Sequence, residues 1–223
     1  MQRESKLSGI ATAVLLLVLA GLLLNMYRSG TEITERLDEY AVARTEYAQL
    51  REQFIRPNAP SDMGYMKTEM ECIGFDALRA MNPDIVGWLT VPNTSISYPI
   101  VQGSDNAWYL RHTFLGERNA SGAVFLDYRN DRAFRDPNSI LHGHNMRDGS
   151  MFAPLHSWAG DTFYIDTPDG RMVFEVFNRQ SVRSNDEVYQ LGEADGRWQV
   201  VTLSTCINGS PNMRFIVQGR GDI

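Results

Sequence analysis

The chain has 223 residues, of which 43% are hydrophobic, and it carries a formal net charge of −6 at pH 7. This acidic balance argues against a nucleic-acid-binding protein, which usually carries a clustered basic face. Two cysteines are too few for a disulfide framework or a thiolate zinc site, and the length suits one large or two small domains.

The N-terminal segment has the pattern of a membrane anchor. Residues 7–27 carry no charged side chain, and as a helix the apolar run Ile10–Tyr27 would span roughly the ~30 Å hydrocarbon core of a bilayer. A cleavable signal peptide would have a shorter apolar run and a small-residue cleavage site. Arg3 and Lys6 precede the run, so the positive-inside bias places the N-terminus in the cytoplasm. We therefore predict a cytoplasmic tip and signal-anchor over residues 1–28, with the remainder outside the cell.

Two helices are predicted after the anchor. In Thr31–Phe54, apolar residues recur every three or four positions and form one stripe on an otherwise charged helix. The two prolines of Arg56–Asp62 end this pattern, and a second helix is expected near Tyr65–Met81. Residues 29–62 are therefore predicted as a helical stalk or linker, and residues 63–223 as the extracellular domain. The apolar stripe consists of Ile33, Leu37, Tyr40, Tyr47, Leu50 and Phe54.

From Ile85 onward the sequence has the pattern of an all-β domain. Short segments rich in β-branched and aromatic residues alternate with turn clusters. Their number predicts a small closed barrel or a sandwich. Short helices are expected near Asp105–Arg111 and Ser150–Leu155, the latter with Ser150 as N-cap. The predicted strands are Val86–Val91, Ser95–Ile100, Ala123–Asp127, Ser139–His142, Thr162–Ile165, Met172–Arg183, Trp198–Ser204 and Met213–Gln218.

The segment "TLSTC" closes a predicted strand with a thiol at Cys206. Because side chains alternate along a strand, Cys206 shares the face of Thr202 and Ser204 and not the apolar face of Leu203. A packing cysteine would more naturally share the apolar face, so the pattern favours a nucleophile. A disulfide between Cys72 and Cys206 stays open, since compartments outside the cell permit disulfides.

A thiol nucleophile needs a base nearby and donors for the oxyanion of the tetrahedral intermediate. The chain has 4 histidines, and the segment "SILHGHNMRDGSMF" places His142 and His144 at a strand end. This H-x-H pair could also bind a metal, although no third ligand of the usual type is obvious nearby. Arg214 begins the strand that follows the loop after Cys206. An antiparallel return would bring this cation beside the thiol, where it could stabilise a thiolate or an oxyanion.

Together these motifs resemble those of sortases, the cysteine transpeptidases of Gram-positive surfaces. The resemblance runs from about Ala77 to Arg220 and points to class B through three quoted segments. It implies an eight-stranded, mainly β, sortase-type barrel with short helices, preceded by N-terminal helices and the anchor. The segments are "NPDIVGWLTVPNTSISYPIVQGSDNAWYLRHTF", "GAVFLDYRN" and "GHNMRDGSMF".

The resemblance also assigns roles to individual residues. It implies Cys206 as the nucleophile, His144 as the acid/base and Arg214 as the cation that stabilises the oxyanion or orients the substrate. His142 departs from the class B pattern, in which that position is commonly aromatic, and its role is open. The matching positions further imply three contacts for the substrate peptide, namely Ser204, Asn106 and Leu110.

The implied reaction is cleavage of an Asn-Pro-x-Thr-like sorting signal after Thr, through a thioacyl enzyme that a cell-wall precursor amine then attacks. No cofactor is required. The implied partners are the sorting peptide, the peptidoglycan precursor amine and, through the N-terminal helix, the membrane of a Gram-positive bacterium. Three alternatives remain open: pilin polymerisation with a lysine acceptor, another thiol peptidase, and a non-catalytic membrane-tethered β-domain.

Overall fold

In a computed structural model, the protein is described over residues 2–56, 72–192 and 198–221. The chain divides into two compact units, Met1–Ala41 and Val42–Ile223. The predicted domain boundaries at residues 28 and 62 stay predictions, and so does any role of Cys72, whose side chain lies outside the described part.

One continuous helix, α1 (Gln2–Phe54), contains both the predicted anchor and the helix predicted after it. Among the described residues, this is the one helix long and apolar enough to cross a membrane, judged by length and composition. In the first half of the predicted stripe, the side chains of Ile33 and Leu37 are 60% and 56% exposed.

The last turns of α1 belong to the second unit and pack within it. Ala43, Tyr47, Leu50 and Phe54 are buried at a spacing of three to four residues. The Tyr47 hydroxyl donates a hydrogen bond to the backbone carbonyl oxygen of Gly122 at 2.8 Å. Burial of this hydroxyl raises the pKa of Tyr47 well above its ordinary value. The second half of the predicted stripe is therefore a packing surface.

Two short elements and a helix lead into the barrel. Strand β1 (Ile55–Arg56) pairs antiparallel with β2 (Cys72–Ile73), and α2 (Phe75–Met81) follows. The helix predicted near Tyr65–Met81 is confirmed in its C-terminal part, and residues 65–71 lie outside the described residues.

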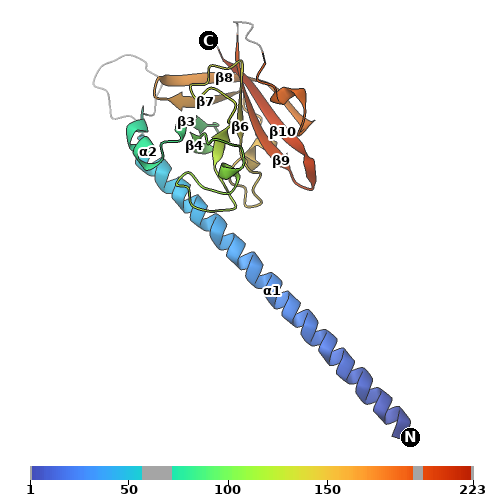
Figure 1. The fold of residues 1–223 in the computed structure, drawn as a ribbon. Helices are drawn as coiled ribbons and strands as arrows, with labels where there is room; N and C mark the ends of the chain where they lie inside the picture. The colour runs from blue at the N-terminus through green and yellow to red at the C-terminus, as the bar shows by residue number, and fades with distance from the viewer. Residues whose placement is uncertain (1, 57–71, 193–197, 222–223) are drawn as a thin grey trace. The chain divides into compact units, whose positions relative to one another are not determined.

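Eight strands close into a barrel, in the order β10-β8-β7-β3-β4-β5-β6-β9 (Figure 1). The pairs β4–β5 and β6–β9 are parallel, and the other pairings are antiparallel. The closed barrel confirms the predicted fold class. The strands are β3 (Ile85–Thr90), β4 (Ser97–Val101), β5 (Val124–Leu126), β6 (Asn138–His142), β7 (Thr162–Thr167), β8 (Gly170–Arg183), β9 (Gln199–Ile207) and β10 (Ser210–Gly221).

All eight predicted strands exist, but the hairpin β9–β10 is longer than predicted. The register pairs Ile207 with Ser210, so only Asn208 and Gly209 form the turn. Gly209 has a φ of +79°, a value that suits glycine in a two-residue hairpin turn. As a result Cys206 lies inside β9 and not beyond its end.

Apolar side chains of the barrel strands are buried, and consecutive ones such as Trp88 and Leu89 face opposite sides of their strand. Trp88 and Leu89 of β3, Phe163 of β7 and Leu203 of β9 are fully buried. Burying side chains of this size contributes about 1.5–3 kcal/mol each to the hydrophobic driving force.

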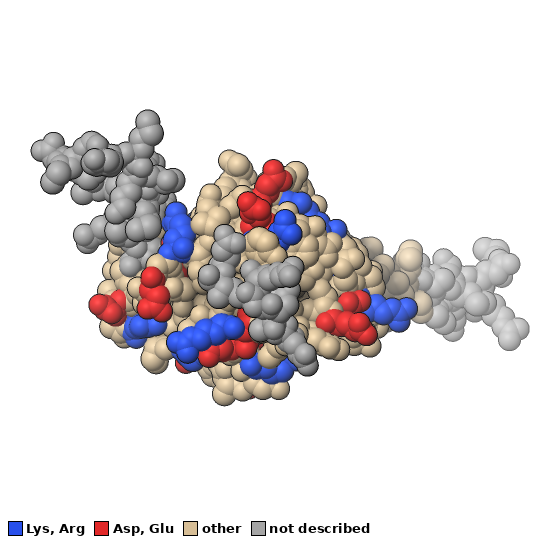
Figure 2. All heavy atoms as spheres, turned by 90° about the horizontal axis from the view of Figure 1, so that it is seen from above, with Lys and Arg blue, Asp and Glu red and all other residues tan. Residues whose placement is uncertain are grey.

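On the face of the molecule shown in Figure 2, acidic and basic side chains lie intermixed.

Short 3-10 helices replace the two predicted short helices. They are η1 (Trp108–Leu110) and η2 (Ala153–His156), and a third, η3 (Glu187–Tyr189), lies between β8 and β9. The predicted N-cap at Ser150 is wrong. Residue 152 occupies the cap of η2, and the Ser150 hydroxyl instead donates a hydrogen bond to Asp148 at 2.6 Å.

Candidate active site

Three neighbouring strands bring the predicted catalytic residues together. In the parallel pair β6–β9, His142 lies beside Ser204; His144 and Cys206 each follow two residues later, and both line the same cleft. In the antiparallel pair β9–β10, Arg214 lies directly opposite Cys206. Cys206 therefore has the histidine-bearing chain on one side and the arginine-bearing strand on the other.

Cys206 is a free, half-buried thiol. Its backbone carbonyl oxygen lies 3.0 Å from the amide nitrogen of Asn145 and 3.2 Å from Nε2 of His156. These contacts hold the backbone of the nucleophile from the side of the loop that follows β6. Partial exposure leaves the sulfur accessible to a reagent or a substrate.

The ring of His144 is oriented by one hydrogen bond. Its Nε2 lies 2.8 Å from the backbone carbonyl oxygen of Leu110. Because a carbonyl oxygen only accepts, Nε2 carries a proton, and in the neutral ring Nδ1 is then the basic nitrogen. His144 is thus set up to receive a proton through Nδ1.

Gly143 is required for packing. A Cβ at this position would lie 2.7 Å from Cγ of Phe152, whose side chain is fully buried. In the structure its smallness lets the Phe152 ring pack directly under the backbone that leads into His144.

Backbone carbonyl oxygens at the start of β10 hold the guanidinium of Arg214. Its Nη1 donates hydrogen bonds to the carbonyl oxygens of Pro211 at 2.8 Å and Met213 at 2.9 Å. This anchoring leaves the other guanidinium nitrogens available to a developing negative charge near Cys206.

All six residues predicted for the site line one cleft of about 340 Å³. Asn106 and Leu110 come from the segment around η1, and Ser204 from β9. The cleft is also lined by residues that were not predicted as site residues. These are Phe125, Asp127, Arg129, His142, Gly143, Ser184, Tyr189 and Thr205.

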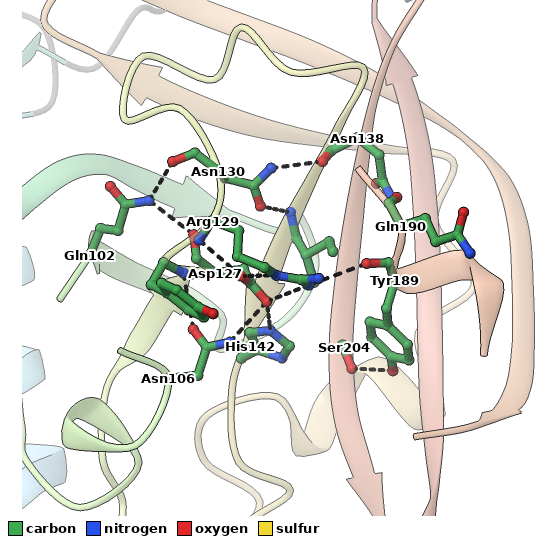
Figure 3. A network of polar contacts seen from close by, with 12 residues as sticks. Gln102, Asn106, Asp127, Arg129, Asn130, Asn138, His142, Tyr189, Gln190 and Ser204 are labelled. Atoms are coloured by element: carbon green, nitrogen blue, oxygen red, sulfur yellow. Dashed lines mark hydrogen bonds and ion pairs between the residues drawn. The ribbon is translucent and has the colours of Figure 1, made fainter. Parts of the chain in front are cut away.

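A polar network centred on Asp127 forms one wall of the cleft (Figure 3). The carboxylate of Asp127 accepts hydrogen bonds from Arg129 at 2.8 and 3.0 Å and from the amide of Asn106 at 2.9 Å, and it lies 3.3 Å from Nε2 of His142. Burial alone would raise the pKa of Asp127. The hydrogen bonds from His142, Arg129 and Asn106 outweigh burial and hold it well below its usual value.

Tyr189 extends this wall from η3. Its hydroxyl lies 2.7 Å from the Ser204 hydroxyl, and its backbone carbonyl oxygen accepts a hydrogen bond from Arg129 at 3.2 Å. Burial raises the pKa of Tyr189 above its ordinary value, so the phenol stays protonated at neutral pH. These contacts join the loop between β8 and β9 to the strand that carries the nucleophile.

His142 and His144 make different contacts, one with Asp127 and the other with the Leu110 carbonyl oxygen. Within the described ranges, no group of three His, Cys, Asp or Glu side chains is arranged to hold a metal ion. The H-x-H spacing is therefore better explained by these two separate contacts.

The additional cleft residues differ in how much the sequence reveals of them. Asp127 and Arg129 stand in the segment "GAVFLDYRN", directly after a buried strand, and that position could have marked them. Asn145 does not line the cleft, but it directly follows His144, and that position could have marked it. Tyr189 lies in a loop of ordinary composition, and only the folded chain brings it to Ser204.

A model of the sortase domain family matches residues 89–222. Sortase B of Listeria monocytogenes is 43% identical over 111 residues, which cover 50% of this chain and 42% of that protein. Sortase B of Staphylococcus aureus is 30% identical over 166 residues, which cover 70% of this chain and 65% of that protein. The chain thus spans less than two thirds of these two relatives.

Solved structures of class B sortases share the fold. Sortase B from Bacillus anthracis in complex with AAEK1 matches with a TM-score of 0.65 and 30% identity, over 83% of this chain and 99% of that one. A Streptococcus pyogenes class B sortase involved in pilus biogenesis matches with a TM-score of 0.59 and 31% identity, over 67% of this chain and 98% of that one. The chain therefore belongs to the sortase family and is most similar to its class B members.

Proposed function

We propose that the protein is a membrane-anchored cysteine transpeptidase that cleaves an Asn-Pro-x-Thr-like sorting signal after Thr and joins the surface protein to a cell-wall amine. The observation that supports this proposal is the pairing of Arg214 with Cys206 between β9 and β10, in a cleft that His144 also lines. Membership of the sortase family supports the same chemistry.

In the first half of the proposed reaction, the Cys206 thiol gives its proton to Nδ1 of His144 and the sulfur attacks the Thr carbonyl carbon. Arg214 stabilises the resulting oxyanion. The intermediate collapses with cleavage of the C–N bond, and His144 returns the proton to the leaving amine. The product is a thioester between the Thr carbonyl and Cys206.

In the second half, the amine of a peptidoglycan precursor attacks the thioester carbonyl. His144 takes the proton that this amine loses and passes it to the departing sulfur of Cys206. A peptide bond forms, the C–S bond breaks, and the free thiol is restored. Every step uses groups that line the cleft together with the two substrates.

Helix α1 is proposed to anchor the enzyme in the membrane of a Gram-positive bacterium, with a cytoplasmic N-terminus and an extracellular catalytic unit. Its length and composition support this proposal, and so do Arg3 and Lys6 before the apolar run. Confining enzyme and membrane-bound substrates to one surface raises their effective concentration.

The test is incubation of the full chain in detergent with a library of fluorogenic sorting peptides. We expect cleavage after Thr in the wild type and none in the Cys206→Ala variant. The absence of any Cys206-dependent cleavage would favour a non-catalytic tethered β-domain. Cleavage without transfer to any added amine would favour another thiol peptidase.

A second candidate is pilin polymerisation, favoured by the similarity to the Streptococcus pyogenes class B sortase involved in pilus biogenesis. The two functions differ in the acceptor amine. In competition, a peptidoglycan-precursor amine should capture most of the acyl group if the enzyme anchors proteins to the wall. A lysine-containing pilin peptide should capture it if the enzyme builds pili.

A further inference from the structure

His142 is the cleft residue at which this chain departs from the class B pattern. Its side chain is 23% exposed and lines the cleft, and its ring stacks toward that of Tyr189 with centroids 6.4 Å apart. In the register it lies beside Ser204, two strand positions before Cys206. An imidazole therefore stands in the substrate cleft, close to the nucleophile and outside the steps described above.

Asp127 fixes which nitrogen of His142 carries the proton. The carboxylate of Asp127 is buried and receives hydrogen bonds on both oxygens, so it stays ionised and can only accept. Nε2 of His142, 3.3 Å away, must then donate. In the neutral ring Nδ1 is left as a hydrogen-bond acceptor, the same arrangement that carboxylates impose on many functional histidines.

This acceptor is open to the cleft. Among the described residues, no group makes a hydrogen bond to Nδ1 of His142. The buried polar atoms without a partner do not include Nδ1, so this unpartnered nitrogen is not buried. An unpartnered nitrogen that is not buried, on a ring that lines the cleft, is accessible to a ligand in the cleft.

Arg129 provides a donor on the same wall of the cleft. Arg129 is 42% exposed, lines the same cleft and binds the same carboxylate through Nε and Nη2. Within the described part of the chain its Nη1 makes no hydrogen bond. The acceptor of His142 and the donor of Arg129 therefore sit on one wall (Figure 3) and together complement a primary amide, which carries both a donor and an acceptor. A carboxylate would offer His142 no proton, and an apolar side chain would leave both groups unpaired.

The position of the pair indicates which substrate residue it meets. Two strand positions correspond to about 7 Å, and an extended peptide advances about 3.3 Å per residue. For a peptide that has its Thr carbonyl at Cys206 and runs along β9 toward Ser204, the residues that reach His142 are those two or three positions upstream. In an Asn-Pro-x-Thr signal these are Pro and Asn, and of the two only Asn has a side-chain donor.

We propose that His142 and Arg129, both held by Asp127, form an amide-recognition site for the first residue of the sorting signal, with His142 as the specificity-determining residue. This inference rests on the proposed function for the identity of the peptide. It assigns a role to the histidine that replaces the commonly aromatic residue.

The test is a double-mutant cycle between His142 and the peptide amide. Binding is measured by fluorescence anisotropy on the full chain in detergent, in a Cys206→Ala background that cannot turn over. One arm is His142→Phe, which keeps an aromatic ring beside Phe125 and Tyr189 and removes both nitrogens. The other arm replaces Asn in the peptide by Nδ,Nδ-dimethylasparagine, which removes the donor hydrogens and needs no change in the protein.

We expect each change alone to weaken binding about tenfold, the value of one net hydrogen bond, and the two together to weaken it no further. His112→Phe, in a histidine outside the cleft lining, should leave the affinity unchanged. Independent effects that multiply to about a hundredfold, or no effect of either change, would overturn the proposal. If peptides bind with this coupling but the Cys206-containing chain cleaves none, the transpeptidase function fails and the recognition site stands.

Discussion

The side-chain amide of Asn145 donates a hydrogen bond to the backbone carbonyl oxygen of Cys206 at 3.0 Å. Asn145 directly follows His144, so this one contact ties the loop that carries the proposed base to the strand that carries the proposed nucleophile. The separation of the two proposed reacting groups therefore depends in part on a side-chain hydrogen bond from a residue outside the Cys-His-Arg set.

Asn145→Ala should lower kcat about tenfold and leave KM nearly unchanged, because the residue positions reacting groups and does not line the cleft. Steady-state kinetics on the full chain with a cleavable peptide would measure both parameters. Asn178→Ala is the matched control, since it removes a side-chain hydrogen bond of similar length, to Gln218 between β8 and β10, at a residue that does not line the cleft. An equal loss in both variants would contradict the positioning role.

Gly143→Ala should destabilise the protein by about 1–3 kcal/mol, the usual cost of overpacking a core. The added Cβ would lie 2.7 Å from Cγ of Phe152, a ring with no space to move. Urea denaturation followed by tryptophan fluorescence would report the free energy of unfolding. Gly30→Ala in α1, where nothing lies within 4 Å of the new atom, should cause no loss.

Replacing Arg214 by Ala should lower kcat by about 10²–10³, the typical effect of losing one oxyanion donor. Lys should restore only part of the activity, because its single nitrogen cannot bind the Pro211 and Met213 carbonyl oxygens, as Nη1 of Arg214 does, and also supply the further donors of the guanidinium. Arg220→Ala, farther along the same strand, should have kinetics like the wild type. Full activity of Arg214→Lys would show that a point charge suffices.

Asp127 should make stability depend on acid pH. Its pKa in the folded state lies below the unfolded value of about 3.9, so its ionised form stabilises the fold above that pH. The wild type should exceed Asp127→Asn in free energy of unfolding by about 1–3 kcal/mol from about pH 5 upward. As the pH falls below about 4 toward the folded pKa, this difference should shrink. A constant difference down to about pH 3 would mean that the charge on Asp127 contributes nothing.

The strands were predictable because each is a short, β-branched and aromatic segment bounded by turn residues, and all eight were found near their predicted positions. Strand ends were less predictable. The extension of β9 through Cys206 depends on pairing with β10 across a two-residue turn, which is a property of the partner strand. The continuity of α1 was missed because the anchor and the charged helix differ in composition, although the backbone hydrogen bonds run through both.

The candidate site divides in the same way. Cys206, His144 and Arg214 stand in motifs with a recognisable order, and their convergence follows from strand register. The contacts that build the wall of the cleft do not follow from strand register. The contacts of Tyr189 with Ser204 and of His142 with Asp127 join residues 15 positions apart in each case, across loops whose path no local pattern specifies.

The central claim is that Cys206 forms a thioester with the Thr carbonyl of a sorting peptide. The most direct measurement is intact-protein mass spectrometry of the full chain after brief incubation with peptide, without an acceptor amine. We predict a mass increase equal to the acyl fragment ending in Thr, located on Cys206 by peptide mapping, absent from Cys206→Ala and discharged by an added amine. A peptide that is cleaved with no adduct on Cys206, or with the adduct on another residue, would contradict the account.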